Sequence, residues 1–312
     1  MNLLHLKYAV EVEKTSSITK AADNLYMGQP NLSRAIRELE DSLGIQIFKR
    51  TPKGIYPTPQ GEEFLGYAKK ILAQVDVVEN LYRGGKAEKQ KFAISVPRAS
   101  YISCAFTEFM KKLDRSKCAD VFYKETNSMR AINNIINADY NLGILRYRSS
   151  YERYFKELLE SKGLESELVC EFDYVLLMSE RSPLAKKEKI VLEDLKDCIE
   201  IAHADPYVPS LPMNTVQREE LDDGVNNHVF VFERGSQMDL LGALPNSFMW
   251  ASPVPERLLK LYGLTERRCE GTERKYKDVL IRHADYMFTD IDKLFIDELG
   301  KAKRHVTDQN AK

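Results

Sequence analysis

The sequence predicts a chain with two folded regions of different class, a small helical region followed by a larger α/β region. Three observations predict this division. Short apolar stripes at helical spacing dominate the first 58 residues, one long helical pattern follows, and strands alternate with helices from Lys91 onward. A length of 312 residues exceeds one typical domain and fits two or three.

The clearest element is a helix of about four turns that begins near Pro30 and stops at Gly44. Proline suits the first helical turn, where its missing N–H costs nothing, and glycine suits the left-handed residue after the last turn. An apolar stripe runs along one side and contains Leu32, Ile36, Leu39 and Leu43. The opposite side is polar and partly cationic, with Asn31, Ser33, Arg34, Arg37 and Asp41.

The elements around this helix predict a winged helix-turn-helix. Residues 2–14 form a first helix that backs it, and a short second helix begins after Ser17 as N-cap. Gly28 closes the tight connection between the second helix and the third. After Gly44, two extended runs at 45–49 and 55–58 flank a Pro/Gly turn, and Lys49 together with the two cations of the turn gives the hairpin three cations. Such a fold places one helix in a major groove.

We therefore predict that the chain binds double-stranded DNA. Gln and Asn pair bidentately with adenine and Arg with guanine, whereas wing cations contact phosphate or the minor groove. The predicted contacts are Gln29, Asn31, Ser33, Arg34 and Arg37 on the helix, and Lys49, Arg50 and Lys53 on the wing. Two alternatives stay open: an internal ion pair for Arg50, and a plain helical core with surface charge for the whole segment 1–58.

Bulk charge does not decide between these interpretations. The whole chain has a formal net charge of −1, and residues 1–60 contain 8 Lys/Arg against 6 Asp/Glu. The DNA prediction therefore depends on where the cations lie.

A long helical pattern at 59–83 carries a heptad seam formed by Phe64, Ala68, Ile71, Val75, Val78 and Tyr82. A seam of this kind outside a compact domain would lie in water, so we expect a second copy of the chain to cover it, which gives a homodimer. The alternative is that the seam packs on its own domain. The segment 83–86, which contains two glycines, ends the helix and forms a hinge.

Repeated strand–turn–helix units from Lys91 onward predict a parallel, doubly wound sheet and a second lobe. Strands are expected at 92–96, 121–124, 140–145, 169–178, 199–202, 229–232, 248–251 and 277–281. Helices are expected at 100–112, 126–137, 193–195, 236–242 and 289–303. The strand at 169–178 would begin the second lobe, and the chain would return to the first from residue 266.

Open α/β sheets bind ligands at the carboxyl ends of their strands, where helix N-termini point N–H groups into a crevice. The turns at these positions contain the effector-site candidates Arg98, Ser100, Tyr101, Thr126, Asn127, Ser128, Arg146, His203, Asp205 and Trp250. Arginines beside hydroxyl-bearing turns suit a small anion such as a carboxylate. The alternatives are solvated surface charges for Arg98 and Arg146 and a core position for Trp250.

Several other function classes lack support in the sequence. No nucleophile-elbow, P-loop, zinc-protease or dinucleotide motif occurs, and the five histidines have no metal-ligand spacing, so we predict no enzyme, metal or cofactor. Only His203 with Asp205 resembles a catalytic pair. Five scattered cysteines favour reduced thiols over a redox-sensing pair, and the lack of a signal peptide or long apolar run favours a cytoplasmic protein without a membrane partner. A solute-binding protein would explain the second half but not the first 83 residues.

The amino-terminal pattern resembles the LysR-type transcriptional regulators. The matching positions are Ser17-Ile18-Thr19-x-Ala21-Ala22-x-x-Leu25, Gln29-Pro30-x-Leu32-Ser33-x-x-Ile36-x-x-Leu39-Glu40-x-x-Leu43-Gly44, Ile47-Phe48-x-Arg50 and Thr58-x-x-Gly61. Two departures occur: Thr15 and Ser16 stand where the family usually has a glycine, and Asn31 replaces the usual small residue beside the proline. Asn31 could therefore give a different operator preference.

The resemblance implies a periplasmic-binding-protein-like effector domain of two α/β lobes, with landmarks at 141–144 and 242–247. It implies three regions: a winged helix-turn-helix domain (1–58), a linker helix and hinge (59–88), and an effector domain (89–312). Lobe 1 would comprise about 91–163 and 266–303, and lobe 2 about 164–265. It also implies a homodimer or homotetramer, a small-molecule effector that changes lobe packing and DNA bending, and RNA polymerase as a candidate partner.

Overall fold

The computed structural model describes residues 2–52, 54–82, 89–137, 140–204, 224–272 and 274–310. The chain divides between Glu88 and Lys89 into two compact units, and each is described by itself. No helix within the described ranges is both long enough and apolar enough to span a bilayer.

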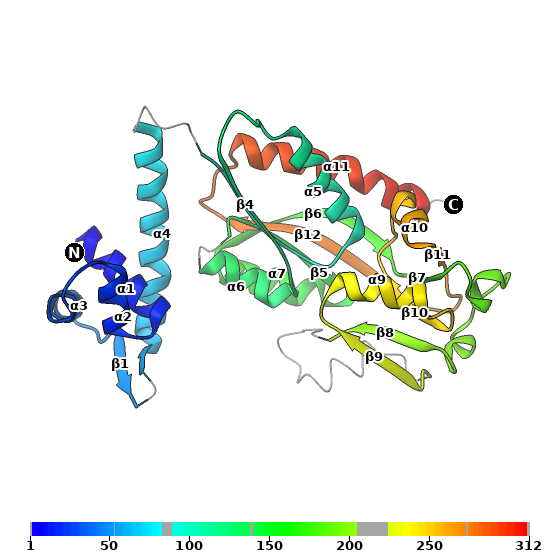
Figure 1. The fold of residues 1–312 in the computed structure, drawn as a ribbon, viewed down its shortest axis with the longest axis horizontal. Helices are drawn as coiled ribbons and strands as arrows, with labels where there is room; N and C mark the ends of the chain where they lie inside the picture. The colour runs from blue at the N-terminus through cyan, green and yellow to red at the C-terminus, as the bar shows by residue number, and fades with distance from the viewer. Residues whose placement is uncertain are drawn as a thin grey trace. The chain divides into compact units, whose positions relative to one another are not determined.

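The amino-terminal unit contains the predicted helices within a residue or so of their expected ends. They are α1 (Leu3–Thr15), α2 (Ile18–Asn24), α3 (Gln29–Leu43) and α4 (Pro59–Tyr82) (Figure 1). Ser17 caps α2 by accepting a hydrogen bond from the backbone N–H of Lys20, and Gly44 ends α3 in the left-handed conformation (φ 66°). The apolar stripe of α3 lies in the core of this unit, as predicted.

The wing is an antiparallel pair, β1 (Phe48–Thr51) and β2 (Gly54–Pro57). Its first strand begins three residues later than the run at 45–49 predicts. The reason is Glu40, whose Oε1 accepts hydrogen bonds from the backbone N–H groups of Ile47 (2.7 Å) and Phe48 (3.0 Å). These amides are therefore used to attach the wing to α3 before strand pairing begins.

The start of α4 explains the Thr58-x-x-Gly61 pattern physically. The Thr58 hydroxyl accepts a hydrogen bond from the Gly61 backbone N–H at 2.9 Å, and the Thr58 N–H donates to the Ile47 carbonyl. A Cβ on Gly61 would lie 2.0 Å from that same carbonyl oxygen, so a side chain cannot be accommodated there.

The heptad seam of α4 has two parts. Ala68 is buried and Phe64 packs against the core of the amino-terminal unit, which agrees with the alternative interpretation for these two positions. Ile71 and Val78 are 36% and 53% exposed, and Val75 is partly buried. The Tyr82 side chain and the predicted hinge at 83–86 lie outside what the structure describes.

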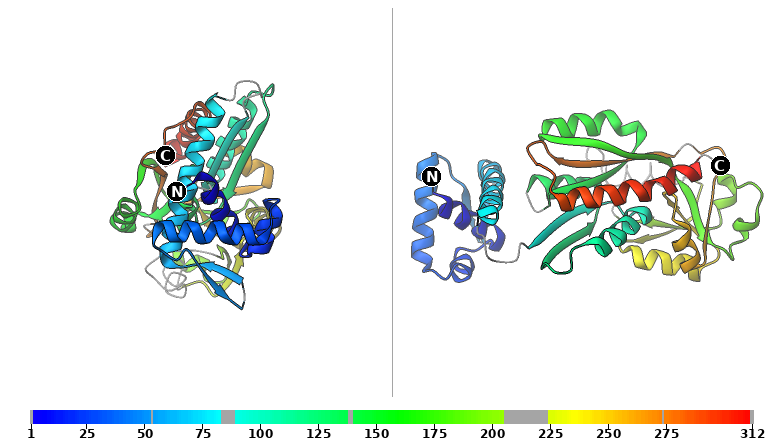
Figure 2. Two further views of the ribbon diagram at one scale, coloured as in Figure 1. Left: turned by 90° about the vertical axis from the view of Figure 1, so that its left-hand side faces the viewer. Right: turned by 90° about the horizontal axis from the view of Figure 1, so that it is seen from above.

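The carboxyl-terminal unit contains two five-stranded sheets. The first has the order β4-β3-β5-β12-β6, formed by β3 (Gln90–Val96), β4 (Ala119–Glu125), β5 (Leu142–Arg148), β6 (Leu164–Asp173) and β12 (Lys275–His283). Helices α5 (Ser100–Lys112) and α11 (Asp290–Asn310) cover one face, and α6 (Ser128–Ile136) and α7 (Glu152–Ser161) cover the other (Figure 1 and Figure 2).

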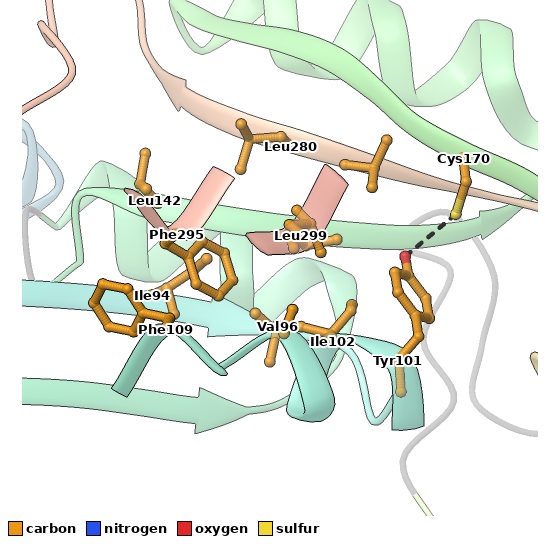
Figure 3. Packing of buried hydrophobic residues seen from close by; sticks show 14 of the residues in the cluster. Ile94, Val96, Tyr101, Ile102, Phe109, Leu142, Cys170, Leu280, Phe295 and Leu299 are labelled. Carbon is orange, nitrogen blue, oxygen red and sulfur yellow. Dashed lines mark hydrogen bonds between the residues drawn. The ribbon is translucent and has the colours of Figure 1, made fainter. Parts of the chain in front are cut away.

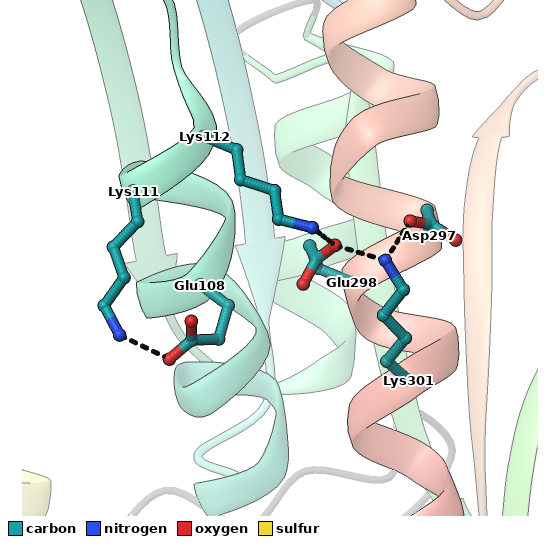
Figure 4. A network of polar contacts seen from close by, with 6 residues as sticks. All are labelled: Glu108, Lys111, Lys112, Asp297, Glu298 and Lys301. Atoms are coloured by element: carbon teal, nitrogen blue, oxygen red, sulfur yellow. Dashed lines mark hydrogen bonds and ion pairs between the residues drawn. The ribbon is translucent and has the colours of Figure 1, made fainter.

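The face under α5 and α11 holds the main core of this lobe, which includes Phe92, Phe109 and Phe295, whose rings are in mutual contact. Figure 3 shows Phe109 and Phe295 in this core. At the surface, ion pairs join the same two helices (Figure 4). Glu298 of α11 accepts from Lys112 of α5 at 2.6 Å and from Lys301 at 2.7 Å.

The second sheet has the order β11-β7-β10-β8-β9, formed by β7 (Val175–Ser179), β8 (Ile199–His203), β9 (Asn227–Val231), β10 (Ser247–Ala251) and β11 (Leu264–Arg267). Alternate residues face opposite sides. Leu177 and Met249 pack with α9 (Arg234–Ala243) and with α10 (Glu256–Tyr262), while Leu176 and Trp250 pack with the short helices η2 (Pro183–Lys186) and η3 (Leu192–Leu195).

Two expectations are corrected here. The run 169–178 is not one strand: β6 pairs with β12 in the first sheet, and β7 pairs with β10 and β11 in the second. The first lobe therefore extends through Asp173, and the segment 164–173 does not belong to lobe 2. The sheets are also mixed and not wholly parallel, because β12 returns from the second lobe and runs antiparallel between β5 and β6. Helices α7 and α10 and strand β11 had no sequence-based prediction.

Candidate DNA interface and inter-lobe site

The outward side of α3 presents the residues that the sequence predicts for base contact. Gln29, Asn31, Arg34 and Arg37 are exposed and Ser33 is half-buried, while the other side of the helix is buried. One unobstructed helix face with bidentate-capable side chains is the arrangement that major-groove contact requires.

The wing adds cations next to this face. Lys49 and Arg50 are exposed on β1, and Arg50 Nη2 lies 3.5 Å from the Ser33 hydroxyl, which accepts its hydrogen bond. Arg50 thus contacts a serine of α3 and not the carboxylate of the alternative interpretation. This contact places the base of the wing beside the polar face. Lys53 lies outside the described residues.

Tyr26, in the turn between α2 and α3, is a residue that the sequence analysis passed over. The residue is 98% exposed and its backbone is left-handed (φ 52°). A residue with a Cβ pays about 1 kcal/mol for this conformation. The signal in the sequence was a bulky residue in a turn where glycine or asparagine is usual.

On the first lobe, the predicted ligand turns follow the carboxyl ends of β3 and β4. Ser100 is buried at the start of α5, and Arg98 is half-buried in the turn before it. Thr126 is buried after β4, and no partner for its Oγ1 is found among the described residues. Asn127 Oδ1 accepts from the Arg130 N–H as the cap of α6.

Arg146 and Tyr101 are not arranged as ligand contacts. The Arg146 Nε and Nη2 donate to the two Asp278 oxygens at 2.7 and 2.6 Å, and the Tyr101 hydroxyl donates to Asp278 at 2.5 Å. Asp278 has no exposed surface and the Arg146 side chain is 10% exposed. Ser128 is also occupied, because its hydroxyl donates to the Arg146 carbonyl. This network joins α5, β5 and β12, so these predicted ligand residues have a structural role.

Burial and charge explain the protonation states in this network. Burial first, and then the Asp278 carboxylate, hold the pKa of Tyr101 well above its usual range. Burial alone would lower the pKa of Arg146, but Asp278 raises it, and the net direction is upward. Cys170, whose thiol lies 3.3 Å from the Tyr101 hydroxyl, has its pKa raised to about 11 by burial (Figure 3).

On the second lobe, His203 ends β8 and its Nδ1 lies 2.8 Å from Nε2 of Gln237 on α9. Asp205 lies outside the described residues. Trp250 packs in the core beneath η2 and η3, with the Arg274 guanidinium 4.4 Å from its ring centre. Core packing therefore accounts for Trp250, as the alternative interpretation has it.

One contact between the lobes was missed by the sequence analysis. Arg234, the first residue of α9, donates to Glu125 at the end of β4 (3.1 Å) and to the Ser100 hydroxyl (3.2 Å). The available signal was a cation at the start of a helix, where the helix dipole disfavours positive charge unless an acid compensates.

Across the described part of the chain, no three His, Cys, Asp or Glu side chains gather as a metal site. All five cysteines are free thiols; Cys118 is exposed, Cys104 is partly buried, and Cys170, Cys198 and Cys269 are buried.

Comparison with known proteins decides the family. The model of the bacterial regulatory helix-turn-helix proteins of the lysR family matches residues 3–62, the segment that carries the polar face of α3 and the wing. The chain is a LysR-type transcriptional regulator. It therefore binds DNA to regulate transcription and is not an enzyme.

Some relatives and solved structures are similar to this LysR-type regulator over most of its length. It is 28% identical to the HTH-type transcriptional regulator AlsR of Bacillus subtilis (strain 168), over 85% of this chain and 83% of AlsR. It is 49% identical to BenM of Acinetobacter baylyi over 24% of this chain and 25% of BenM. Full-length OxyR from Pseudomonas aeruginosa has the same fold (TM-score 0.63, 18% identity, 96% and 98% of the two chains), as does CbnR complexed with its target DNA (0.54, 18%, 97% and 100%).

Proposed function

We propose that this LysR-type regulator reads its operator through the exposed face of α3 and holds the DNA backbone through the wing. The exposed row Gln29, Asn31, Arg34 and Arg37, backed by a fully packed apolar face, is the observation that carries the proposal. Lys49 and Arg50 add affinity without sequence choice, because phosphate contacts carry no base information.

Two substitutions test these separate roles on the full chain. Arg34→Ala should cost about 1–3 kcal/mol of specific operator binding and relax base preference at one position. Lys49→Ala should weaken binding to all sequences equally and lower the slope of affinity against salt by about one counterion. Sedimentation of Arg34→Ala should match the parent protein; a loss of assembly would make Arg34 structural.

The regulator is further proposed to assemble as a homodimer or a homotetramer through the exposed part of the α4 seam. Ile71 and Val78 are exposed apolar residues of this seam. A two-fold operator also needs two recognition helices, one from each subunit. Val78→Lys should dissociate the assembly, with Glu79→Lys on the neighbouring face as the matched control. Glu79→Lys makes the larger change in charge, +2 against +1 for Val78→Lys, so dissociation in Val78→Lys alone would assign the effect to the seam position and not to added charge.

A small anion such as a carboxylate is proposed as the effector, bound at the crevice where the turns after β3 and β4 face α9. The buried Oγ1 of Thr126, which finds no partner among the described residues, supports this position. A thermal-shift screen on the full chain with small carboxylates, amino acids, sugars and nucleosides tests it. Thr126→Val should remove the response to a hit, whereas Thr107→Val, on the exposed side of α5, should keep it.

The remaining assignments follow from these. The functional regions are residues 1–58 for DNA, 59–88 for assembly and 89–312 for the effector. RNA polymerase is the partner through which the regulator would change transcription. The site of action is the cytoplasm, where the chromosomal DNA of bacteria lies.

A further inference from the structure

Among the described residues, the ion pair that joins the two lobes is formed by Arg234. Its Nη1 lies 3.1 Å from Glu125 Oε1, and its Nη2 lies 3.2 Å from Ser100 Oγ. The Arg234 and Glu125 side chains are 19% and 22% exposed, so the pair is largely shielded but reachable from solvent. Arg234 belongs to the second lobe, and its two partners belong to the first.

Glu125 occupies a position that favours negative charge. It ends β4 directly before the turn into α6, and Arg234 also contacts Ser100, the first residue of α5. Carboxylates are stabilised near helix N-termini and by a guanidinium that can donate two hydrogen bonds. The Arg234 guanidinium, in contrast, starts α9 and is disfavoured there without an anion. The contact is therefore an anion-binding position that the chain fills with its own carboxylate.

Unused hydrogen-bonding groups accompany both sides of the pair. Thr126, which follows Glu125, and Gln237, one helical turn after Arg234, are buried. Within the described residues, neither Thr126 Oγ1 nor Gln237 Oε1 has a hydrogen-bond partner, although Gln237 Nε2 is engaged with His203. Buried oxygens without partners carry a desolvation cost that a bound polar molecule would remove.

We propose that Arg234 is the anion receptor of the crevice and that Glu125 occupies it as an internal competitor until a carboxylate ligand displaces it. This rests on the proposed function, in which the crevice binds an effector. The ligand carboxylate would take the Arg234 and Ser100 contacts, and a neighbouring hydroxyl or amino group would donate to Gln237 Oε1. A ligand of this chemistry is a small hydroxy or amino acid. Its binding replaces an ion pair between the lobes with contacts to the ligand.

The test uses lactate and its uncharged amide, lactamide, titrated into the full chain at constant ionic strength and followed by thermal shift. Glu125→Gln should lower the lactate midpoint about tenfold, because the competitor is removed while the residue shape is kept. Arg234→Gln should raise that midpoint at least tenfold. A factor of ten corresponds to about 1.4 kcal/mol, close to the lower end of the range for one hydrogen bond to a charged group. Glu108→Gln and Arg153→Gln make the same charge changes on exposed helices and should leave the midpoint unchanged.

Opposite shifts from the two crevice variants support the competition. Shifts in the same direction, equal shifts in the controls, or no lactate response in Glu125→Gln would overturn it, since a merely structural pair has no reason to give opposite effects. If Arg234→Gln does not fold, Arg234→Lys keeps the charge, loses the two-pronged donor geometry and should still raise the midpoint. A thermal shift with lactamide or another neutral compound, lost in Thr126→Val, would retain the effector crevice while rejecting the role of Arg234.

Discussion

Replacing Asp278 by alanine should destabilise the carboxyl-terminal unit by about 3–5 kcal/mol. Asp278 is fully buried and accepts three hydrogen bonds, two from Arg146 and one from Tyr101. Without the carboxylate, a guanidinium with only 10% of its side chain exposed loses its counter-charge. That uncompensated buried charge is the main cost. The unpaired tyrosine hydroxyl adds to it, but not independently, because the groups share one partner.

Urea unfolding of the full chain measures this loss, with Trp250 fluorescence as a probe confined to the carboxyl-terminal unit. Far-UV circular dichroism checks that the lobe containing Asp278 unfolds in the same transition. Glu157→Ala is the control, because it breaks an exposed pair with Arg153 on α7 and should cause no measurable change. The pairing should also be replaceable: Arg146→Met combined with Asp278→Leu should recover most of the stability.

Two outcomes would refute this reasoning. A loss below about 1 kcal/mol for Asp278→Ala would mean that water reaches Arg146 and that the pair is not isolated from solvent. A double variant as unstable as the single one would mean that shape at this junction, and not charge, provides the stability.

Three further predictions concern other sites. Burial raises the pKa of Glu266. The protonated carboxyl therefore stabilises the folded protein at low pH, and this stabilisation is lost as pH rises through the folded-state pKa. Glu266→Gln should raise the melting temperature at pH 7 but not at pH 4. Cys118 should react with a thiol reagent in the native protein, whereas Cys170, with its pKa raised to about 11, should react only after unfolding; equal rates would contradict its burial. Tyr26→Asn should stabilise the amino-terminal unit by about 1 kcal/mol in urea unfolding, and no gain would show that the left-handed turn is not strained.

The amino-terminal fold could be predicted from sequence because its signals are local. The stop at Gly44, the cap at Ser17 and the stripe of α3 each depend on residues within a few positions of one another. The run 169–178 failed for the opposite reason. No glycine or proline marks the change at Tyr174, and only the choice of distant partner strands divides β6 from β7. Likewise, α7 has no side-chain N-cap at Tyr151 and gave no start signal.

For the proposed inter-lobe site, sequence reasoning names the turns but not the charged pair between the lobes. Ser100 and Thr126 are predicted because strand ends and helix starts can be read along the chain. Which arginine serves an anion depends on its partner in space. Arg146 pairs with the fully buried carboxylate of Asp278 in its own lobe. A ligand that displaced Asp278 would leave that carboxylate buried without a counter-charge.

Arg234 meets a carboxylate of the other lobe that is 22% exposed, so Glu125 can return to water when a ligand takes its place. Replacing the internal carboxylate with a ligand therefore costs less free energy at Arg234 than at Arg146, because at Arg234 no charge is left buried without a partner. Under the proposed competition, the two arginines differ in role because their counter-ions differ in access to solvent. The ligand-dependent contact between the lobes is then at Arg234, whereas Arg146 stays paired with Asp278 inside the first lobe.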